Sequence, residues 1–275
     1  MSLSRREFIK NISAASLVLM GGKVLSITSA QAESLKNESI FRFVVASDGH
    51  YGQTGTDSDL NYTNIVKNIT LFHNQNPIRF CVINGDIMHD EENFLVSAKK
   101  LLDGLPVKYY VTRGNHDLVT ASFWKEVFGM PLNHHVVIDN NAIILADTSN
   151  EKGDFLSPDL VWLKTKLEAY KNKENVFLFL HIPQAMWTKG CADTPAFFEL
   201  VKSYKNIKGV FHGHEHYLDG VRTVEHIPYM FDSHFGGNWG TAYRGYRIVE
   251  VLKTGEIITY QLNPSAGSRV NHAKV

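Results

Sequence analysis

The apolar run Val107-Lys108-Tyr109-Tyr110-Val111-Thr112 stops abruptly at the polar sequence Arg113-Gly114-Asn115-His116-Asp117. We interpret this as a buried strand that ends at the edge of a sheet, where α/β enzymes place their catalytic and binding residues. The amide oxygen of Asn115 can bind a cation, the imidazole of His116 can pass a proton, and Asp117 is placed to orient that imidazole. Gly-Asn alone is a common turn pair, but the polar residues together favour a functional site.

Polar clusters also follow four other apolar runs. The runs cover residues 41–47, 79–83, 175–180 and 207–211, and the clusters after them contain Asp48 with His50, Asp86, His181, and His214 with His216. Helical patterns over 59–75 and 92–102 separate the first three runs, which predicts parallel strands with their carboxyl ends at one edge. One histidine at a strand end is usually structural, whereas their joint occurrence predicts a shared site.

The remaining patterns complete an α/β fold. Residues 134–138 and 142–147 predict a hairpin, and Ser157-Pro158 predicts the start of a helix that ends near residue 173. A further helix is expected from residue 194 to about 204. We expect the strands within residues 221–262 to close a second sheet in antiparallel fashion.

The candidate ligands are carboxylate, amide and imidazole groups without a thiolate. Such ligands suit Zn, Mn or Fe(II), and two ions of this kind lie roughly 3.5–4 Å apart in two-metal hydrolases. The other histidines without a strand-end setting are expected to be structural or exposed: His73, His134, His135, His226 and His272.

In this order and spacing, the motifs resemble those of the calcineurin-like metallophosphoesterases. The resemblance runs from about Phe41 to His216 and consists of Asp-x-His, Gly-Asp, Gly-Asn-His-Asp, an isolated His after a strand, and Gly-His-x-His. It implies a four-layer α/β/β/α sandwich of two mixed sheets flanked by helices. The segment with Asp147, Gly153 and Trp162-Leu163 resembles the family's region between the third and fourth motifs.

The resemblance also implies a role for each candidate residue. Asp48, His50 and His216 would hold one divalent metal ion, Asn115, His181 and His214 would hold a second, and Asp86 would bridge the two. A metal-bridging hydroxide would attack the phosphorus of a small phosphorylated substrate. His116 would be the general acid that protonates the leaving oxygen, with Asp117 supporting it.

Two positions depart from the purple acid phosphatases of this family. His89 stands where those enzymes carry a metal-binding tyrosine, and His50 stands where they lack a histidine. Both differences favour the broader group that includes bacterial cyclic-nucleotide phosphodiesterases. We expect His89 to line the pocket or face solvent rather than bind metal.

Substrate preference stays open between phosphate monoesters, diesters including cyclic nucleotides, and pyrophosphates. A scaffold that has lost activity is the alternative from another class, although all expected ligand positions are filled. Arg113, Arg244 and Arg247 could contact a phosphate, but salt bridges are their more expected role. The pocket-shaping loops are expected at residues 51–57, 185–194 and 235–243, with the aromatic side chains Tyr51, Trp187 and Trp239 either stacking on substrate or packing.

The N-terminus resembles a twin-arginine signal peptide. Arg5-Arg6 precedes a moderately apolar stretch, and Ala30-Gln31-Ala32 is typical of a cleavage site. We therefore expect a signal peptide over 1–32, a linker over 33–40 and a metallophosphoesterase domain over 41–275. The twin-arginine export machinery would be a partner and the location periplasmic or otherwise extracytoplasmic. The apolar stretch is too broken to predict stable membrane insertion.

The charge balance argues against a polymeric nucleic acid as partner. The 275 residues contain 28 basic and 28 acidic side chains, and removing the expected signal peptide leaves a net charge of −3. Cys81 is expected to be a buried apolar residue and Cys191 to lie in a loop. Two free thiols are more expected than a disulfide between them.

Overall fold

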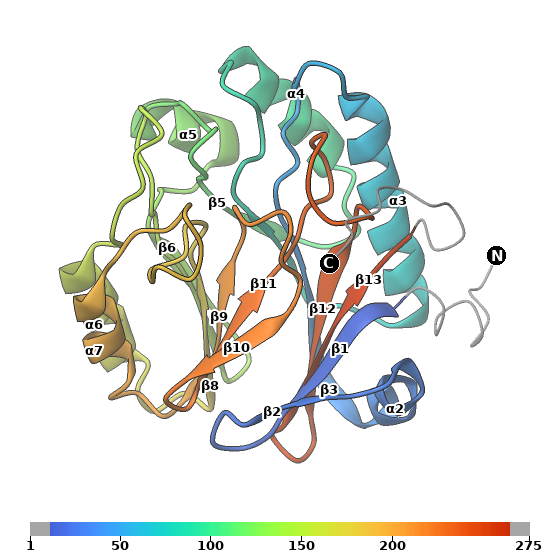
Figure 1. Ribbon diagram of the computed structural model, residues 1–275, viewed down its shortest axis with the longest axis vertical. Coiled ribbons are helices and arrows are strands. Elements are labelled where there is room, and N and C mark those ends of the chain that lie inside the picture. Colours follow the sequence, from blue (N-terminus) through green and yellow to red (C-terminus); the bar gives the residue numbers. More distant parts are fainter. Residues whose placement is uncertain (1–11, 265–275) are drawn as a thin grey trace.

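The computed structural model describes residues 12–264, which form two mixed β-sheets (Figure 1). The strands of the first sheet are β1 (Ile12–Val18), β2 (Val24–Ser26), β3 (Ser39–Ala46), β4 (Cys81–Asn84), β5 (Tyr109–Thr112), β12 (Tyr246–Leu252) and β13 (Ile257–Leu262). Their order is β2-β1-β13-β12-β3-β4-β5. Strands β3, β4 and β5 are parallel neighbours, as the sequence predicts, so their carboxyl ends share one edge.

The second sheet has the order β10-β11-β9-β8-β7-β6. Its strands are β6 (His134–Ile138), β7 (Asn141–Leu145), β8 (Asn175–Phe179), β9 (Ile207–His212), β10 (Val221–Val224) and β11 (Ile227–Phe231). Strands β7, β8, β9 and β11 are parallel, whereas β6 and β10 pair antiparallel at the two ends. The expectation that residues 221–262 close this sheet is therefore wrong for β12 and β13. These strands belong to the first sheet because β12 pairs with β3.

The helices form the two outer layers. They are α2 (Ser29–Leu35), α3 (Ser58–Gln75), α4 (Asn93–Leu102), α5 (Ala121–Phe128), α6 (Leu160–Ala169) and α7 (Pro195–Val201), with a 3₁₀ helix η1 at Lys36–Glu38. Buried side chains of α3, α4 and α5 pack on the first sheet, and those of α6 and α7 pack on the second. The two sheets enclose a third core between them. The predicted four-layer α/β/β/α sandwich is confirmed.

Strand β3 shows why the central runs are apolar almost throughout. Phe43 and Val45 point into the core between the sheets, where Phe43 stacks on Phe80 at a ring-centroid distance of 4.8 Å. Val44 and Ala46 point to the opposite face, under the helices. A strand covered on both faces needs apolar residues at successive positions.

Two helices differ from the sequence predictions. The helix expected to start at Ser157 has Asp159 as its N-cap, and the Asp159 carboxylate accepts hydrogen bonds from the backbone of Val161 and Trp162. Asp satisfies the free N–H groups of a first turn at least as well as Ser, which explains the shift. Helix α5 was not expected; Thr120 caps it, and Gly129 ends it in the left-handed conformation.

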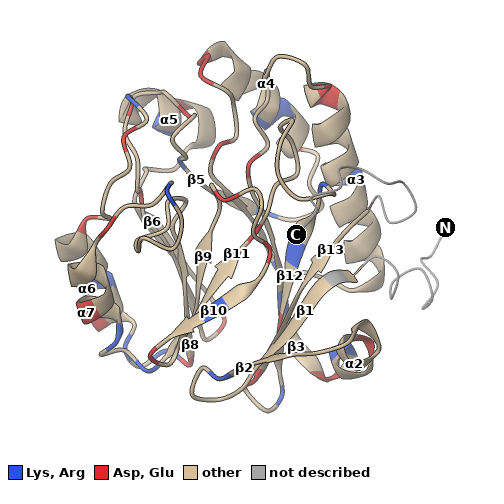
Figure 2. Ribbon diagram, viewed as in Figure 1, with Lys and Arg blue, Asp and Glu red and all other residues tan. Residues whose placement is uncertain are grey.

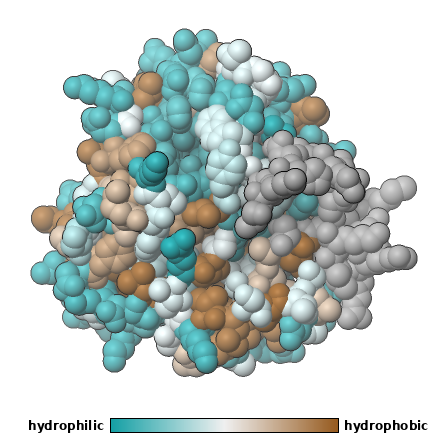
Figure 3. Space-filling model, viewed as in Figure 1, coloured by the Kyte–Doolittle hydropathy of each residue, from teal (hydrophilic) through white to brown (hydrophobic). Residues whose placement is uncertain are grey.

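The stretch expected to contain a signal peptide lies partly in the described residues. There, β1 pairs antiparallel with β13 and extends the first sheet beyond it. Residues 33–40, expected to be a linker, form the end of α2, η1 and the start of β3. The twin-arginine pair falls outside the described residues. Figure 3 shows apolar residues gathered on the face where β1, β2 and β10 lie, and among the described helices no apolar stretch is long enough to cross a membrane.

Candidate metal centre

Five strands from both sheets bring the candidate residues together. Strands β3, β4 and β5 lead into Asp48, Asp86 and Asn115, whereas β8 and β9 of the other sheet lead into His181 and His214. The described side chains form three groups in which nitrogen and oxygen atoms lie within 4.8 Å of one another. These groups are Asp48 with His50 and His216, Asp86 with His181 and His214, and His50 with His89 and His116.

The first cluster consists of Asp48, His50 and His216, all buried. His216 Nε2 lies 3.1 Å from Asp48 Oδ1 and 3.0 Å from His50 Nε2. The Nδ1 atom of His216 donates to the backbone oxygen of Trp239 at 3.1 Å. This hydrogen bond leaves the Nε2 lone pair of His216 directed at the cluster, as a metal ligand requires.

The second cluster consists of Asp86, His181 and His214, with Asn115 beside it. His181 Nε2 lies 3.2 Å from Asp86 Oδ2, and His214 Nδ1 lies 2.8 Å from Asn115 Oδ1. The His181 ring is fixed by its Nδ1, which donates to the backbone oxygen of Asn84 at 2.7 Å. His181 Nε2 is buried and faces Asp86 Oδ2, so it can offer a lone pair to a cation once its proton is lost.

Asp86 lies between the two clusters. Its Oδ2 atom is 3.6 Å from His50 Nε2 in the first cluster and 3.2 Å from His181 Nε2 in the second. Its other oxygen accepts a hydrogen bond from the backbone N–H of His116 at 2.8 Å. One carboxylate oxygen is therefore fixed and the other faces both candidate cation positions.

Unusual backbone conformations let the loops bring these side chains inward. Asp48, His50, Asp86 and His214 have φ between 45° and 66°, a left-handed region that non-glycine residues rarely adopt. Such strained residues concentrate at functional sites. A Cβ at Gly114 would collide with Asp86, so only glycine allows these two loops to approach.

The pKa values in both clusters are set by burial and by the charge pairs between carboxylates and imidazoles. Burial alone would raise the pKa of Asp86, but the facing imidazoles, above all His181, lower it well below its usual value. Burial lowers the pKa of His50 well below 6.5 and, together with His181, that of His214 to about 4, so both imidazoles are neutral at pH 7. For His181, burial acts to lower the pKa, yet the charge of Asp86 outweighs it and raises the pKa to about 10.

The prediction that Asp117 orients His116 is wrong. Asp117 is fully buried, and its oxygens accept hydrogen bonds from the backbone of Met88 and Gly114, so this carboxylate joins two loops. His116 Nδ1 instead lies 2.8 Å from Asp90 Oδ1. Only Nε2 of His116 then remains to face a substrate, and the His116 side chain is 30% exposed. Asp90, four residues after Asp86, was missed by sequence reasoning.

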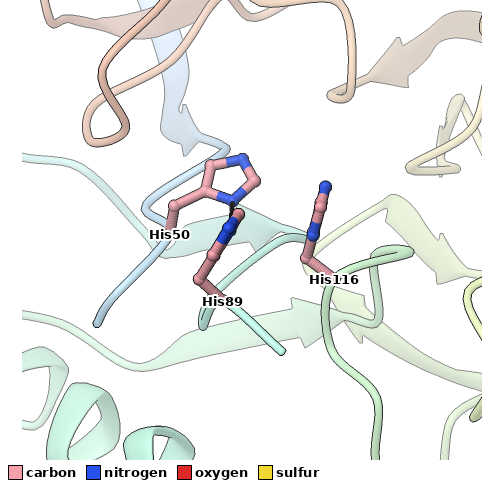
Figure 4. A group of neighbouring side chains, drawn as sticks. All are labelled: His50, His89 and His116. Carbon is pink, nitrogen blue, oxygen red and sulfur yellow. Dashed lines mark hydrogen bonds between the residues drawn. The ribbon is translucent and has the colours of Figure 1, made fainter. Parts of the chain in front are cut away.

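His89 lies beside the first cluster. As Figure 4 shows, the three imidazoles of His50, His89 and His116 come from separate loops and face one another. His89 Nδ1 is 3.1 Å from His50 Nδ1, on the edge of that ring opposite its Nε2 atom. His89 thus lines the site, which is one of the two positions that the sequence analysis left open for it.

Aromatic residues cover the first cluster. Trp239 stacks on His216 at a centroid distance of 4.5 Å and an angle of 4°. His234, which the sequence prediction did not single out, packs parallel to His216 at 5.1 Å. By contrast, Tyr51 donates to Asp59, and Trp187 packs among Phe198, Tyr229 and Phe231.

The three candidate arginines have intramolecular partners. Arg113 pairs with Asp147 at 2.6 Å and donates to two backbone oxygens. Arg247 is buried and pairs with Asp232 at 2.8 Å, and Arg244 donates to the backbone oxygen of Gly237. The expected ion pairs are therefore present for Arg113 and Arg247.

The remaining predictions concern residues away from the clusters. None of the described histidines expected to be structural or exposed joins the three groups; these are His73, His134, His135 and His226, while His272 lies outside the described residues. Cys81 and Cys191 are both buried free thiols, as favoured from the sequence.

Carboxylate and imidazole clusters at the carboxyl ends of two facing mixed sheets are ligand sets of the kind that metal-dependent hydrolases use. The family model of the calcineurin-like phosphoesterases matches residues 41–218. The chain belongs to this family, which implies a phosphoester hydrolase with His and Asp clusters that could bind divalent metal ions.

Solved structures with the same fold are distant in sequence. A dimetal phosphatase from Danio rerio is 14% identical with a TM-score of 0.65, over 82% of this chain and 96% of that one. The anchor in the inner membrane complex of Plasmodium is 14% identical with a TM-score of 0.60, over 86% and 88%. The calcineurin-like phosphoesterase YfkN from Bacillus subtilis is 15% identical with a TM-score of 0.51, over 84% and 92%. Comparison with curated proteins gave no significant match.

Proposed function

We propose that the protein is an exported dinuclear-metal phosphoesterase that hydrolyses phosphate mono- or diesters. The observation that carries this proposal is the position of Asp86, whose Oδ2 atom lies within 3.6 Å of His50 Nε2 and 3.2 Å of His181 Nε2. A carboxylate shared by two sets of nitrogen and oxygen ligands suits a pair of divalent cations such as Mn, Zn or Fe.

The proposal assigns seven residues to the two cations. The first is held by Asp48, His50 and His216, the second by Asn115, His181 and His214, and both by Asp86. When bound, such cations activate water near neutral pH and neutralise the charge that develops on the phosphoryl oxygens.

His116 acts as the general acid for the leaving oxygen. As an imidazolium, His116 donates its Nδ1 hydrogen to Asp90 and presents its Nε2 hydrogen to the leaving oxygen; after the transfer the ring is neutral, with its remaining hydrogen held by Asp90. Asp117 contributes indirectly by tying the loop that carries His116 to the loop that carries His89. The backbone hydrogen bond from His116 to Asp86 keeps the acid next to the cation pair.

A second candidate within this activity is cyclic-nucleotide phosphodiesterase. It is favoured by the presence of His50 in the first cluster and of a histidine at position 89 in place of tyrosine. A small phosphorylated substrate also agrees with the charge distribution, because acidic and basic residues are interspersed over the ribbon in Figure 2. Pyrophosphates are the further alternative that a substrate screen separates.

The inactive scaffold is the contrasting hypothesis, and one protein with this fold is described as an anchor. Metal analysis of the purified protein, followed by hydrolysis assays with Mn²⁺ or Zn²⁺ over phosphomonoesters, cyclic nucleotides, dinucleotides and phospholipid head groups, tests both ideas. We expect about two equivalents of metal and metal-dependent hydrolysis. A protein without bound metal that neither Mn²⁺ nor Zn²⁺ activates would support the scaffold.

A variant tests the acid separately. His116→Ala should keep its metal but lose about 100-fold or more in kcat on esters with poor leaving groups, and much less on an activated phenol ester. The difference arises because a good leaving group needs no proton. Equal losses on the two substrates would count against the acid role.

Export is a separate part of the proposal. It is supported by Arg5-Arg6 and the Ala30-Gln31-Ala32 sequence, and it implies a periplasmic or otherwise extracytoplasmic enzyme that uses the twin-arginine machinery. In the structure, Ala32 is fully buried within α2. Cleavage after Ala32 would therefore require β1 and α2 to detach first. N-terminal sequencing of the exported protein would test cleavage after Ala32. A mature chain that starts before residue 33 would contradict cleavage at this site.

A further inference from the structure

The imidazole of His50 has a different neighbour on each of its two nitrogen atoms. Its Nε2 faces the first cluster, 3.0 Å from His216 Nε2 and 3.6 Å from Asp86 Oδ2. Its Nδ1 faces His89 Nδ1 at 3.1 Å (Figure 4). A neutral imidazole that offers its Nε2 lone pair to a cation carries its hydrogen on Nδ1. His50 then donates that hydrogen to His89.

The other side of His89 meets the candidate acid. Its ring stacks on His116 with a centroid distance of 4.6 Å and an angle of 17°. Its Nε2 lies 3.8 Å from Asp90 Oδ2, while the other oxygen of Asp90 holds His116 Nδ1 at 2.8 Å. One side chain therefore touches a ligand of the first cluster and supports the ring of the proton donor.

We propose that His89 is a positioning residue with two separable contributions, one made by its Nδ1 atom and one by its ring. The Nδ1 atom accepts from His50 and fixes the orientation in which His50 can bind the first cation. The flat ring holds His116 in place beside Asp90. The proposal rests on the proposed two-cation site, and its second half rests also on His116 as the acid.

A third cation among His50, His89 and His116 is the competing explanation, since their nitrogens lie within 4.8 Å of one another. The lone pairs argue against it. His50 has a single lone pair when neutral, and its Nε2 is already directed at Asp86 and His216. Binding a further cation through Nδ1 would need the ring to lose both hydrogens, and Asp90, the carboxylate beside His89 and His116, already accepts from His116 Nδ1.

Two substitutions separate the two contributions. His89→Asn places a carboxamide oxygen near the position of Nδ1, so it keeps the acceptor and removes the ring. His89→Phe keeps a flat ring against His116 and removes the acceptor. Mn²⁺ affinity is measured by competition with a chromophoric chelator, and kcat at saturating Mn²⁺ is measured on an activated aryl ester and on an alkyl ester.

We expect His89→Phe to weaken binding of the Mn²⁺ ion of the first cluster about 10- to 100-fold, the usual effect of losing a partner of a metal-bound histidine. His89→Asn should bind Mn²⁺ within about threefold of the wild type but lose more activity on the alkyl ester than on the aryl ester. His135→Asn, which removes an imidazole paired with Tyr170 outside the three clusters, is the matched control and should change neither readout.

Equal Mn²⁺ affinity for the wild type and His89→Phe would overturn the role of the Nδ1 atom. Loss of a third metal equivalent in both variants would replace the proposal with a third cation site. The titration needs no hydrolysis, so the two proposals can fail separately. If the wild-type protein is inactive but His89→Asn and His89→Phe still differ in Mn²⁺ affinity, the proposed function is rejected and the positioning role of His89 is supported.

Discussion

The two candidate cation clusters use similar residues but are enclosed to different degrees. In the first, Asp48 and His50 are fully buried and His216 is 2% exposed, and Trp239 and His234 pack along the His216 ring. In the second, His181 is buried, but Asn115 and His214 are only half-buried. Ligands that are fixed before binding lose less conformational freedom when a cation arrives. The first cluster should therefore bind its cation more tightly, and the second should exchange it more readily.

The largest effect is expected from replacing Asp86, because this carboxylate faces both clusters. Its loss should abolish metal binding in both, so that they no longer differ in affinity. Asp86→Ala should abolish binding of both metal equivalents and reduce hydrolysis on the order of 1,000-fold or more. Metal analysis after dialysis checks this, with Asp139→Ala as a control that removes an exposed carboxylate paired with Arg79. Retention of one tight equivalent by Asp86→Ala would show that Asp86 does not bridge.

A pair of histidine variants tests the ranking of the clusters. His214→Ala should lose the weaker metal equivalent and keep the tighter one, whereas His216→Ala should lose the tighter one. Both should reduce hydrolysis by roughly 100-fold or more because each leaves a single cation. Equilibrium dialysis against Mn²⁺ distinguishes them, and we expect the remaining equivalent to bind at least about tenfold more tightly in His214→Ala. The reverse order would contradict the argument from burial.

The pH dependence of metal binding sharpens the comparison further. In the metal-free protein, the charge of Asp86 outweighs burial and raises the pKa of His181 in the second cluster to about 10. The imidazolium must lose its proton before a cation can bind, so affinity for the second equivalent should rise about tenfold per pH unit between pH 6 and 9. Calorimetry in buffers with different ionisation enthalpies should show one proton released by His181. A flat profile would mean that His181 is neutral or is not a ligand.

The strands and the strand-end residues were predictable from sequence because both signals are local. Apolar runs such as 79–83 are required by burial on both faces, and a polar cluster directly after such a run must lie at the sheet edge. The family resemblance then supplied the pairing of the two sheets, which no local pattern contains. The assignment of β12 to the first sheet was missed because its partner, β3, lies about 200 residues earlier.

The partners of His116 could not be predicted from its neighbours in the chain. Asp117 is adjacent in sequence, but the turn directs its side chain into the interior, where it accepts two backbone hydrogen bonds. Asp90 comes from the loop after β4 and reaches His116 only because β4 and β5 are parallel neighbours. The same applies to His89 and Trp239, whose contacts depend on loop conformations. Residue propensities likewise do not predict the positive φ angles of Asp48, His50 and Asp86.

The smallest effect on either cluster is expected from removing the N-terminal edge of the first sheet. A chain of residues 33–275 lacks β1, so β13 keeps β12 but loses the second of its two partner strands along Ile257–Leu262, and Leu17 no longer packs on the core. We expect a cost of roughly 2–4 kcal/mol in the free energy of unfolding, from the apolar groups exposed, and a fall of about 5–15 °C in Tm. Calorimetry with metal titration on both chains checks this.

Metal affinity and kcat of the shortened chain should stay within about twofold of the full chain, because the candidate ligands follow strands other than β1 and β2. In the full chain, Leu17→Asp should lower the free energy of unfolding as removal of β1 does. Leu25→Asp, at a position already 39% exposed, should not lower it. Loss of metal by the shortened chain would make the edge part of the site. Concentration-dependent self-association would show that β13, now an exposed edge strand, pairs with a strand of another molecule, as exposed edge strands can do. Unchanged stability would instead indicate that β1 contributes little packing energy.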